Sequence, residues 1–192
     1  QGVWKKLHDP TMARSHVVTC WRIMHGALPV NAFCLRVNGN LTAEEGCCSH
    51  PACHATFTLE TLTHALMECP AIAPAVDWLL EVWKALTGRK PQRTAAVLLA
   101  DEGAAAGMGV AGGGGRSRRR AAPPRHVLWH RLRVALLGTI WHCRSNRAVY
   151  ADEQGGLATR IVAMVVDHVQ ACIRRDWLRV THDVRLLSHA TP

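Results

Sequence analysis

The sequence predicts a mainly α-helical protein, with a small helical domain built around a Cys/His-rich segment and a long antiparallel helical hairpin after it. Three observations favour this fold. Apolar residues recur at helical spacing in several separate stretches of the chain. Half of the eight cysteines lie between residues 47 and 69. The composition changes to Ala, Gly and Arg between residues 103 and 124.

This change of composition marks the boundary between the two parts of the chain. At 192 residues the protein can bury a sizeable core. We expect a helical domain over residues 1–102, a Gly/Arg/Pro-rich linker over 103–124 and a helical hairpin over 125–192.

The first domain is expected to contain at least three helices. The first spans residues 15–25, and the second is a short helix opened by Pro29 and closed by Gly39. The third begins at Pro74 and ends at Gly88. Their apolar faces consist of Val17, Val18, Trp21 and Met24; of Val30, Phe33, Cys34 and Val37; and of Val76, Leu79, Leu80, Trp83 and Leu86. The short apolar run 97–100 allows no assignment.

The hairpin is expected to consist of helices at residues 126–148 and 157–180. Gly155 and Gly156 break the chain between them, and so short a connection favours antiparallel pairing. The first helix is expected to bury Leu128, Leu132, Ala135, Leu136, Thr139 and Cys143, with Trp129 and Ile140 at the margin. The second is expected to bury Val162, Val165, Val166, Val169, Cys172, Ile173 and Val180.

The Cys/His-rich segment has the spacing of a metal site. It reads C-x4-C-x10-H-x4-C from Cys48 through Cys53 and His64 to Cys69. Two soft ligands close together, followed by a second such pair, are what a tetrahedral zinc ion needs. Four closing ligands, with no carboxylate expected nearby to act as a base, indicate one structural Zn2+ ion rather than a catalytic one.

Other interpretations of these residues remain open at this point. Isolated buried cysteines or a disulfide would give the same sequence pattern. A lone His64 on a helix would more often be a core or surface histidine than a metal ligand. The clustering of the cysteines favours the metal. Cys47 could replace Cys48 as the first ligand, and His50 and His54 are weaker substitutes.

The charge of the chain indicates a polyanionic partner. The net charge is +9, and arginine supplies most of the basic residues. Its planar guanidinium suits phosphate, so a nucleic acid is expected. A genome rich in G and C would also enrich Arg, Ala and Gly, but the clustering of the basic residues favours binding.

Two groups of basic residues are candidates for contacts with RNA. One is the Gly/Arg tract, which could instead be a solvated linker. The other is a flank of the 126–148 helix, where His126, His130, Arg133 and Arg144 share one side of a helical wheel. An ordinary solvated helix face would look the same. The expected RNA-binding residues are Arg116, Arg118, Arg119, Arg120, Arg125, His130, Arg133, Arg144 and Arg147.

Several motifs resemble the zinc-binding domain that follows reverse transcriptase in non-LTR retrotransposons. They are Trp21-Arg-Ile-Met-His-Gly26 with Leu28-Pro29, and Glu60-Thr61 with His64 and Cys69-Pro70. The likeness covers residues 17–86, and 126–150 more loosely through Ile140-Trp-His-Cys-Arg-Ser-Asn-Arg147. The resemblance implies that Cys48, Cys53, His64 and Cys69 are the ligands. The family usually separates its first two cysteines by two residues, whereas four separate them here.

These observations predict a non-catalytic, zinc-stabilised RNA-binding scaffold, because no nucleophile–base pair, paired carboxylates or open metal site can be assembled. The expected partners are structured rRNA and neighbouring proteins of a large ribonucleoprotein, with no membrane or small-molecule substrate. We expect an intracellular, mitochondrial or other organellar location, and a targeting peptide before Gln1 would not be visible. The alternatives are the nucleic-acid-binding end of an active retrotransposon polyprotein and a zinc-stabilised protein–protein adaptor.

Overall fold

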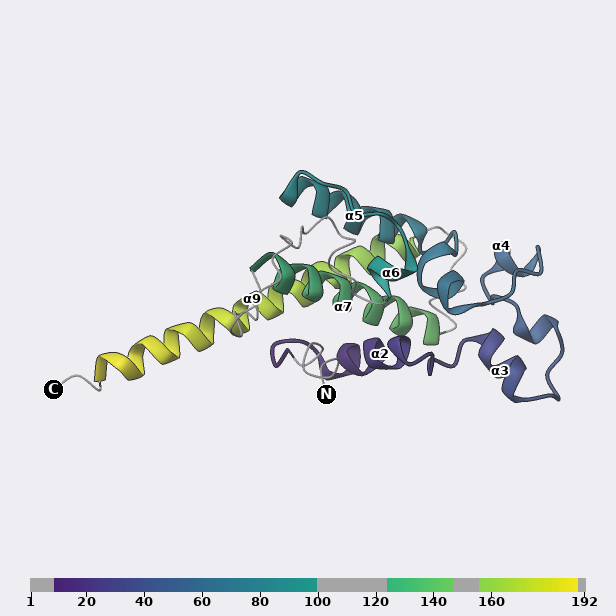
Figure 1. Ribbon diagram of the computed structural model, residues 1–192, viewed down its shortest axis with the longest axis horizontal. Coiled ribbons are helices and arrows are strands. Elements are labelled where there is room, and N and C mark those ends of the chain that lie inside the picture. The colour runs from purple at the N-terminus through teal and green to yellow at the C-terminus, as the bar shows by residue number, and fades with distance from the viewer. Residues whose placement is uncertain (1–8, 100–123, 147–155, 190–192) are drawn as a thin grey trace, which may run out of the picture.

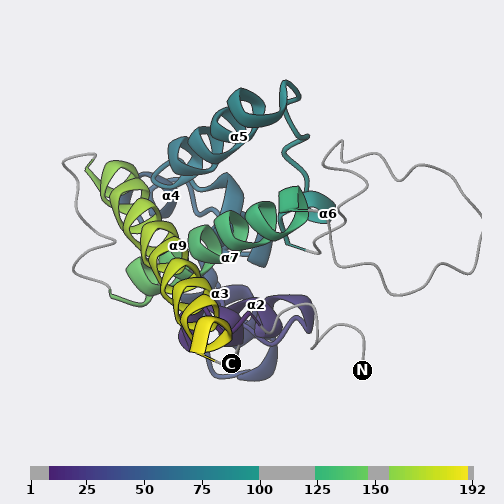
Figure 2. The same ribbon diagram turned by 90° about the vertical axis from the view of Figure 1, so that its left-hand side faces the viewer.

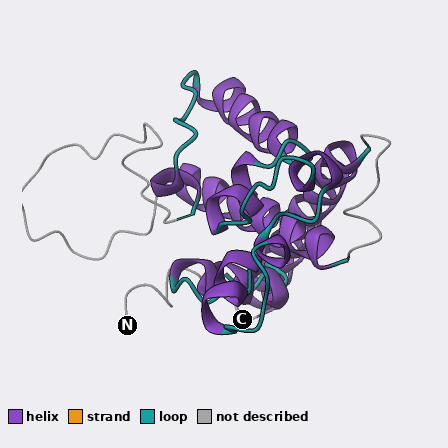
Figure 3. Ribbon diagram, turned by 90° about the vertical axis from the view of Figure 1, so that its right-hand side faces the viewer, coloured by secondary structure: helices purple, strands orange, loops and turns teal. Residues whose placement is uncertain are grey.

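A computed structural model describes residues 9–99, 124–146 and 156–189. Within these ranges the protein consists of helices and connecting loops, and an isolated antiparallel bridge pairs Cys47 with Leu59 (Figure 3). The elements are α2 (Arg14–Met24), α3 (Asn31–Val37), η1 (Glu44–Gly46), α4 (Pro51–His54), η2 (His64–Glu68), α5 (Ala73–Thr87), α6 (Ala95–Leu98), α7 (Pro124–Ser145) and α9 (Leu157–His189). The prediction of a mainly helical protein is confirmed.

Helix α7 lies at the centre of the arrangement. It runs between α5 and α2, and α9 crosses it (Figures 1 and 2). The short elements α3 and α4 lie together at one end of the molecule (Figure 1). Helix α7 can hold this position because every residue from Leu132 to Ile140 is buried. The helix is therefore enclosed on all sides over this stretch, which includes the buried polar residues Arg133 and Thr139.

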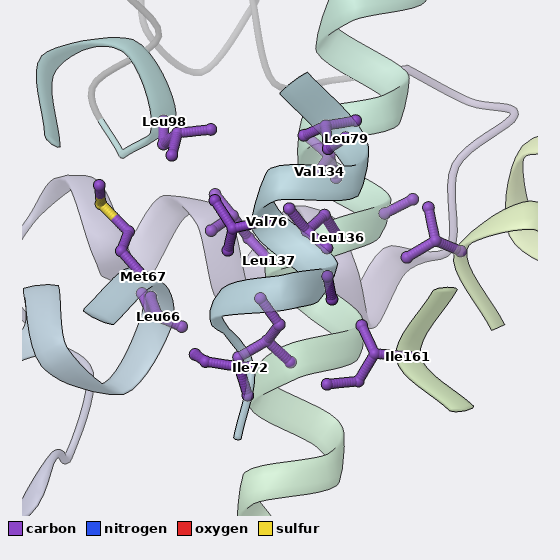
Figure 4. Packing of buried hydrophobic residues seen from close by; sticks show 14 of the residues in the cluster. Leu66, Met67, Ile72, Val76, Leu79, Leu98, Val134, Leu136, Leu137 and Ile161 are labelled. Carbon is purple, nitrogen blue, oxygen red and sulfur yellow. The ribbon is translucent and has the colours of Figure 1, made fainter. Parts of the chain in front are cut away.

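The core joins residues from both predicted parts of the chain. Side chains of η2, α5, α6, α7 and α9 meet in one cluster (Figure 4). The rings of Trp83 on α5 and Trp129 on α7 meet edge-on, with their centroids 5.0 Å apart. Trp129 and Ile140 were expected at the margin of the α7 stripe, but both are fully buried. The predicted domains 1–102 and 125–192 thus share one core, and their boundaries stay a prediction.

The helices predicted in the first part of the chain are present, but the buried face of α2 consists of His16, Val17, Thr19, Cys20 and Ile23, whereas Trp21, which was expected in its apolar face, is 37% exposed. Gly88 ends α5 in the left-handed conformation, at φ 76°, as a glycine after a helix commonly does. Helix α3 starts two residues after Pro29 and ends before Asn38, so Gly39 is not its cap. Leu86 was expected in the apolar stripe of α5, but it lies in the last turn and is exposed. Of the unassigned run 97–100, Val97 and Leu98 belong to the single turn α6 (Ala95–Leu98), and Leu99 caps it.

The antiparallel hairpin of α7 and α9 is confirmed. Arg131, near the start of α7, donates hydrogen bonds to Asp176 in the later part of α9 and to Asp9, the latter at 2.7 Å. Arg175 donates to the carbonyl oxygen of Thr11 at 2.6 Å. These contacts fasten α9 both to α7 and to the turn before α2.

Helix α9 departs from the prediction in its second half. Its buried residues Leu157, Ile161, Val165 and Cys172 lie in the part that crosses the body of the protein. Beyond them the helix continues away from the other helices (Figure 1). The prediction that Val166, Ile173 and Val180 are buried is wrong, because these side chains are 36%, 55% and 58% exposed; Ile173 and Val180 follow the last buried residue of the helix.

Candidate metal centre

Cys48 and Cys53 are brought together by a compact turn. Pro51 opens the one-turn helix α4, in which Cys53 lies. The backbone of Thr58 then fastens the loop, because its N–H donates to Cys53 O at 3.0 Å and its carbonyl accepts from Cys48 N at 2.8 Å. The four residues between the two cysteines are thus accommodated by an extra helical turn.

His64 and Cys69 lie at the two ends of the π-helical turn η2. The N–H of Cys69 donates to the carbonyl oxygen of His64 at 2.9 Å, which is a bond from residue i+5 to residue i. Such wide turns occur often at functional sites. The wide turn explains how a gap of four residues, one longer than an α-helical turn would suggest, still places both side chains in one site.

The four side chains converge in the interior. One ligand atom from each of Cys48, Cys53, His64 and Cys69 lies within 4.8 Å of the others, and all four residues are buried. The Sγ atoms of Cys53 and Cys69 are 3.7 Å apart. A disulfide would need about 2.05 Å. The group can therefore hold one metal ion, and none of its cysteines forms a disulfide within the described structure.

The environment of the group is unfavourable for thiolates without a cation. Burial raises the pKa of the Cys53 thiol above its usual value, and the nearby charges of Cys48 and Glu60 add to this. The Nε2 atom of His64 is buried and has no hydrogen-bond partner in the described structure. A metal ion in the group could satisfy that nitrogen and would stabilise the deprotonated sulfurs.

The structure separates Cys48 from its alternatives. Cys47 is buried but lies outside the group, and its Sγ faces the carbonyl oxygen of Ala43 at 3.5 Å. His50 and His54 also lie outside it. The side chain of His54 is exposed and lies 3.7 Å from Glu44. Of the ligand sets considered, only the one that begins at Cys48 is brought together.

A buried carboxylate lies beside the group, contrary to expectation. Glu60 is fully buried, and its carboxylate accepts hydrogen bonds from Asn31 N, at 2.9 Å, and from the Arg144 guanidinium. Asn31 in turn donates to the carbonyl oxygen of Cys47 at 2.6 Å. Glu60 thus ties the Cys/His-rich segment to α3 and α7. A buried acid at this place has no periodic signal, so the sequence did not reveal it.

The basic flank predicted on α7 does not face solvent. Arg133 is fully buried and donates to the carbonyl oxygens of Leu98 and Leu99, at 3.0 and 3.4 Å, at the end of α6. Arg144 is only 12% exposed because it pairs with Glu60. The expectation that these two arginines lie on an accessible face is therefore wrong. His126 and His130 are both partly buried.

The remaining candidates for RNA contacts cannot be placed. Arg116, Arg118, Arg119, Arg120 and Arg147 lie outside the described residues, as does the predicted linker except Pro124, which is the first residue of α7. Arg125 belongs to the first turn of α7, but its side chain is not described.

Comparisons of the chain with protein-family models, with curated proteins and with solved structures found no match. The likeness to retrotransposon zinc-binding domains therefore stays a hypothesis. No helix in the described ranges is both long and apolar enough to cross a lipid bilayer.

Proposed function

We propose that Cys48, Cys53, His64 and Cys69 hold one structural zinc ion, and that the protein is a non-catalytic RNA-binding scaffold. The observation that carries this proposal is the buried group of three thiols and one imidazole. This donor set and tetrahedral zinc suit each other. Two sulfurs that each lie about 2.3 Å from a tetrahedral ion are about 3.8 Å apart. The 3.7 Å separation of the Cys53 and Cys69 sulfurs is close to that value.

A structural role is favoured over a catalytic one. Four protein ligands complete a tetrahedral shell and leave no position for substrate or water. The buried acid Glu60 forms an ion pair with Arg144 and accepts from Asn31, both through Oε1, which is a structural role; its Oε2 has no hydrogen-bond partner in the described structure. The ion would instead fasten the loop that carries Cys48 and Cys53 to the turn η2 beneath α5 and α7.

RNA is the partner that the charge of the chain favours. A net charge of +9, supplied mostly by arginine, attracts phosphate. Because Arg133 and Arg144 are engaged inside the protein, we assign the contacts to the Gly/Arg tract and to Arg125 and Arg147. A structured rRNA within a large ribonucleoprotein, such as an organellar ribosome, is the assembly we propose. Descent from a retroelement zinc-binding domain would account for the order of the ligands.

The metal can be tested by elemental analysis of the purified protein. We expect about one zinc per chain, and its removal by a chelator should lower the melting temperature. Cys53→Ser and His64→Ala should each lose the metal. Cys47→Ser is the matched control, since this thiol is equally buried but lies outside the group, and it should keep the metal. Loss of zinc from Cys47→Ser together with retention in Cys48→Ser would refute the ligand set.

RNA binding can be tested through its salt dependence. Each phosphate contact contributes roughly 0.7–0.9 to the slope of log affinity against log salt. If Arg116, Arg118, Arg119 and Arg120 lie on phosphates, replacing all four by Ala should make the slope shallower by up to about 3. The loss should be similar for unrelated RNA sequences, because backbone contacts carry no base information.

A control variant with the same loss of charge distinguishes RNA contacts made by the Gly/Arg tract from a general attraction of RNA to the positive net charge. Arg14, Arg22, Arg89 and Arg160 are exposed residues of the described structure. Replacing these four by Ala should change the slope much less. Equal slopes for both quadruple variants would mean that RNA responds only to net charge. An unchanged slope in the tract variant would remove RNA from the proposed function and leave the zinc site standing.

A further inference from the structure

The second half of α9 carries an apolar seam that no described part of the chain covers. Ile173, Trp177 and Val180 follow one another at spacings of four and three residues, which places them on one face of the helix. Their exposed fractions are 55%, 68% and 58%. Large apolar side chains exposed in a row mark interaction surfaces more often than single exposed ones do.

The position of the seam gives a partner room to approach. Helix α9 has 33 residues and extends well past the other helices (Figure 1). The sequence continues the same spacing through Val184 and Leu187. Alternating steps of four and three are the heptad pattern by which one helix packs against another. The buried face of α9, which includes Val165 and Cys172, is a neighbouring face of the helix and is already used.

The charges around the seam favour an acidic partner. Between Ile173 and Val180 the helix carries Arg174, Arg175 and Arg179, and its one acid there, Asp176, is already held by Arg131. Arg174 directly follows Ile173 and occupies the flanking position that faces a partner helix in a heptad. A second copy of this chain would bring the same arginines and an equally positive net charge, so self-association is disfavoured.

We propose that the seam docks an acidic amphipathic helix of a partner protein. Such a helix would place its apolar side chains against Ile173, Trp177 and Val180 and a glutamate or aspartate opposite Arg174. The aliphatic residues favour protein over nucleic acid, because Ile173 and Val180 offer neither a stacking face nor a hydrogen bond. This surface is separate from the Gly/Arg tract, so the inference does not depend on RNA binding.

The proposal can be tested with a designed probe. The probe is a fluorescently labelled synthetic helix about four heptads long, with Leu at the two core positions and Glu at the flanking positions. Repulsion between glutamates keeps the peptide from pairing with itself. A second peptide carries Lys in place of every Glu. Fluorescence anisotropy with the full-length protein should show binding of the Glu peptide and at least roughly tenfold weaker binding of the Lys peptide.

Variants on the exposed half of α9 locate the binding face. Ile173→Ser combined with Trp177→Ser should weaken binding of the Glu peptide roughly a hundredfold, because two large side chains no longer become buried. Leu178→Ser is the matched control, since Leu178 is equally exposed, at 65%, but lies on another face of the helix. It should leave the affinity unchanged. Arg174→Glu should reverse the preference between the Glu and Lys peptides.

Three results would overturn the proposal. The first is failure of the Glu peptide to bind. The second is a dimer of the protein alone in sedimentation experiments that the Ile173→Ser/Trp177→Ser variant abolishes, because the occupant would then be a second copy. The third is an equal loss of RNA and peptide affinity in that variant, because the seam would then belong to the RNA surface. Circular dichroism should confirm that each variant remains folded.

Discussion

The stability of this protein should fall on mild acidification because of one buried histidine. His16 of α2 is packed between α7 and α9, and its ring meets that of His168 edge-on with centroids 4.3 Å apart. Its Nδ1 atom is buried without a hydrogen-bond partner in the described structure. Burial, with repulsion from His168 and His142, lowers the pKa of His16 from 6.5 to about 4.

The sign and size of the effect follow from this shift. Because the pKa is lower in the folded state, the unfolded chain binds the proton more readily between about pH 6.5 and pH 4. The stabilisation is therefore complete above this window and is lost as the pH falls through it. Between pH 7 and pH 5, His16 alone should remove about 2 kcal/mol from the free energy of unfolding.

The assay is urea unfolding at pH 7 and at pH 5 with wild type and His16→Gln. Groups other than His16 contribute to the acid loss in both proteins, so the difference between the two losses isolates His16. The variant should lose about 2 kcal/mol less than wild type. His25→Gln makes the same change at the exposed end of α2 and should retain the wild-type loss. Equal losses in wild type and His16→Gln would refute the reasoning.

Three further predictions concern contacts of the interior. Glu60→Gln leaves the Arg144 guanidinium buried without its counter-charge and should lower the free energy of unfolding by about 3–5 kcal/mol, whereas Glu60→Gln combined with Arg144→Met should recover part of the loss. Gly138→Ala would place a Cβ atom 2.3 Å from the His16 ring and should cost about 1–3 kcal/mol by urea unfolding, while Gly39→Ala, with open space around it, should change stability by less than about 0.5 kcal/mol. Arg133→Ala should lower the melting temperature and leave the salt slope of RNA binding unchanged, since this arginine hydrogen-bonds to α6 and not to solvent; a shallower slope at wild-type stability would contradict its burial.

The helices and the buried Cys/His group could be predicted because their signals are local. Apolar spacing reveals an amphipathic helix wherever it packs, as α2 and α5 show. The Cys/His spacing likewise lies within one short segment. The exact ligand set needed the structure, because Cys47 and Cys48 are adjacent in sequence and only the turn through α4 decides which of them faces inward.

The remaining features depend on contacts that sequence periodicity does not contain. A helical wheel places Arg133 outside because it is charged, yet the carbonyl groups at the end of α6 make its burial tolerable. Glu60 and Arg144 are 84 positions apart, so nothing local links them. Periodicity also cannot tell whether an apolar face is covered by the same chain, and so it assigned Ile173 and Val180 of the seam to the core.

The order in which the chain is synthesised gives the central position of α7 a further consequence. Cys53 and Cys69 are 16 positions apart, so the Cys/His-rich segment can fold soon after it leaves the ribosome. Asp9, just before α2, can form its ion pair only after Arg131 of α7, 122 positions later, has been synthesised. Until α7 emerges, the apolar face of α2, with Cys20 and Ile23, has no partner and is open to aggregation or to a chaperone. Conditions that slow translation between residues 70 and 140 should therefore lower the yield of folded protein.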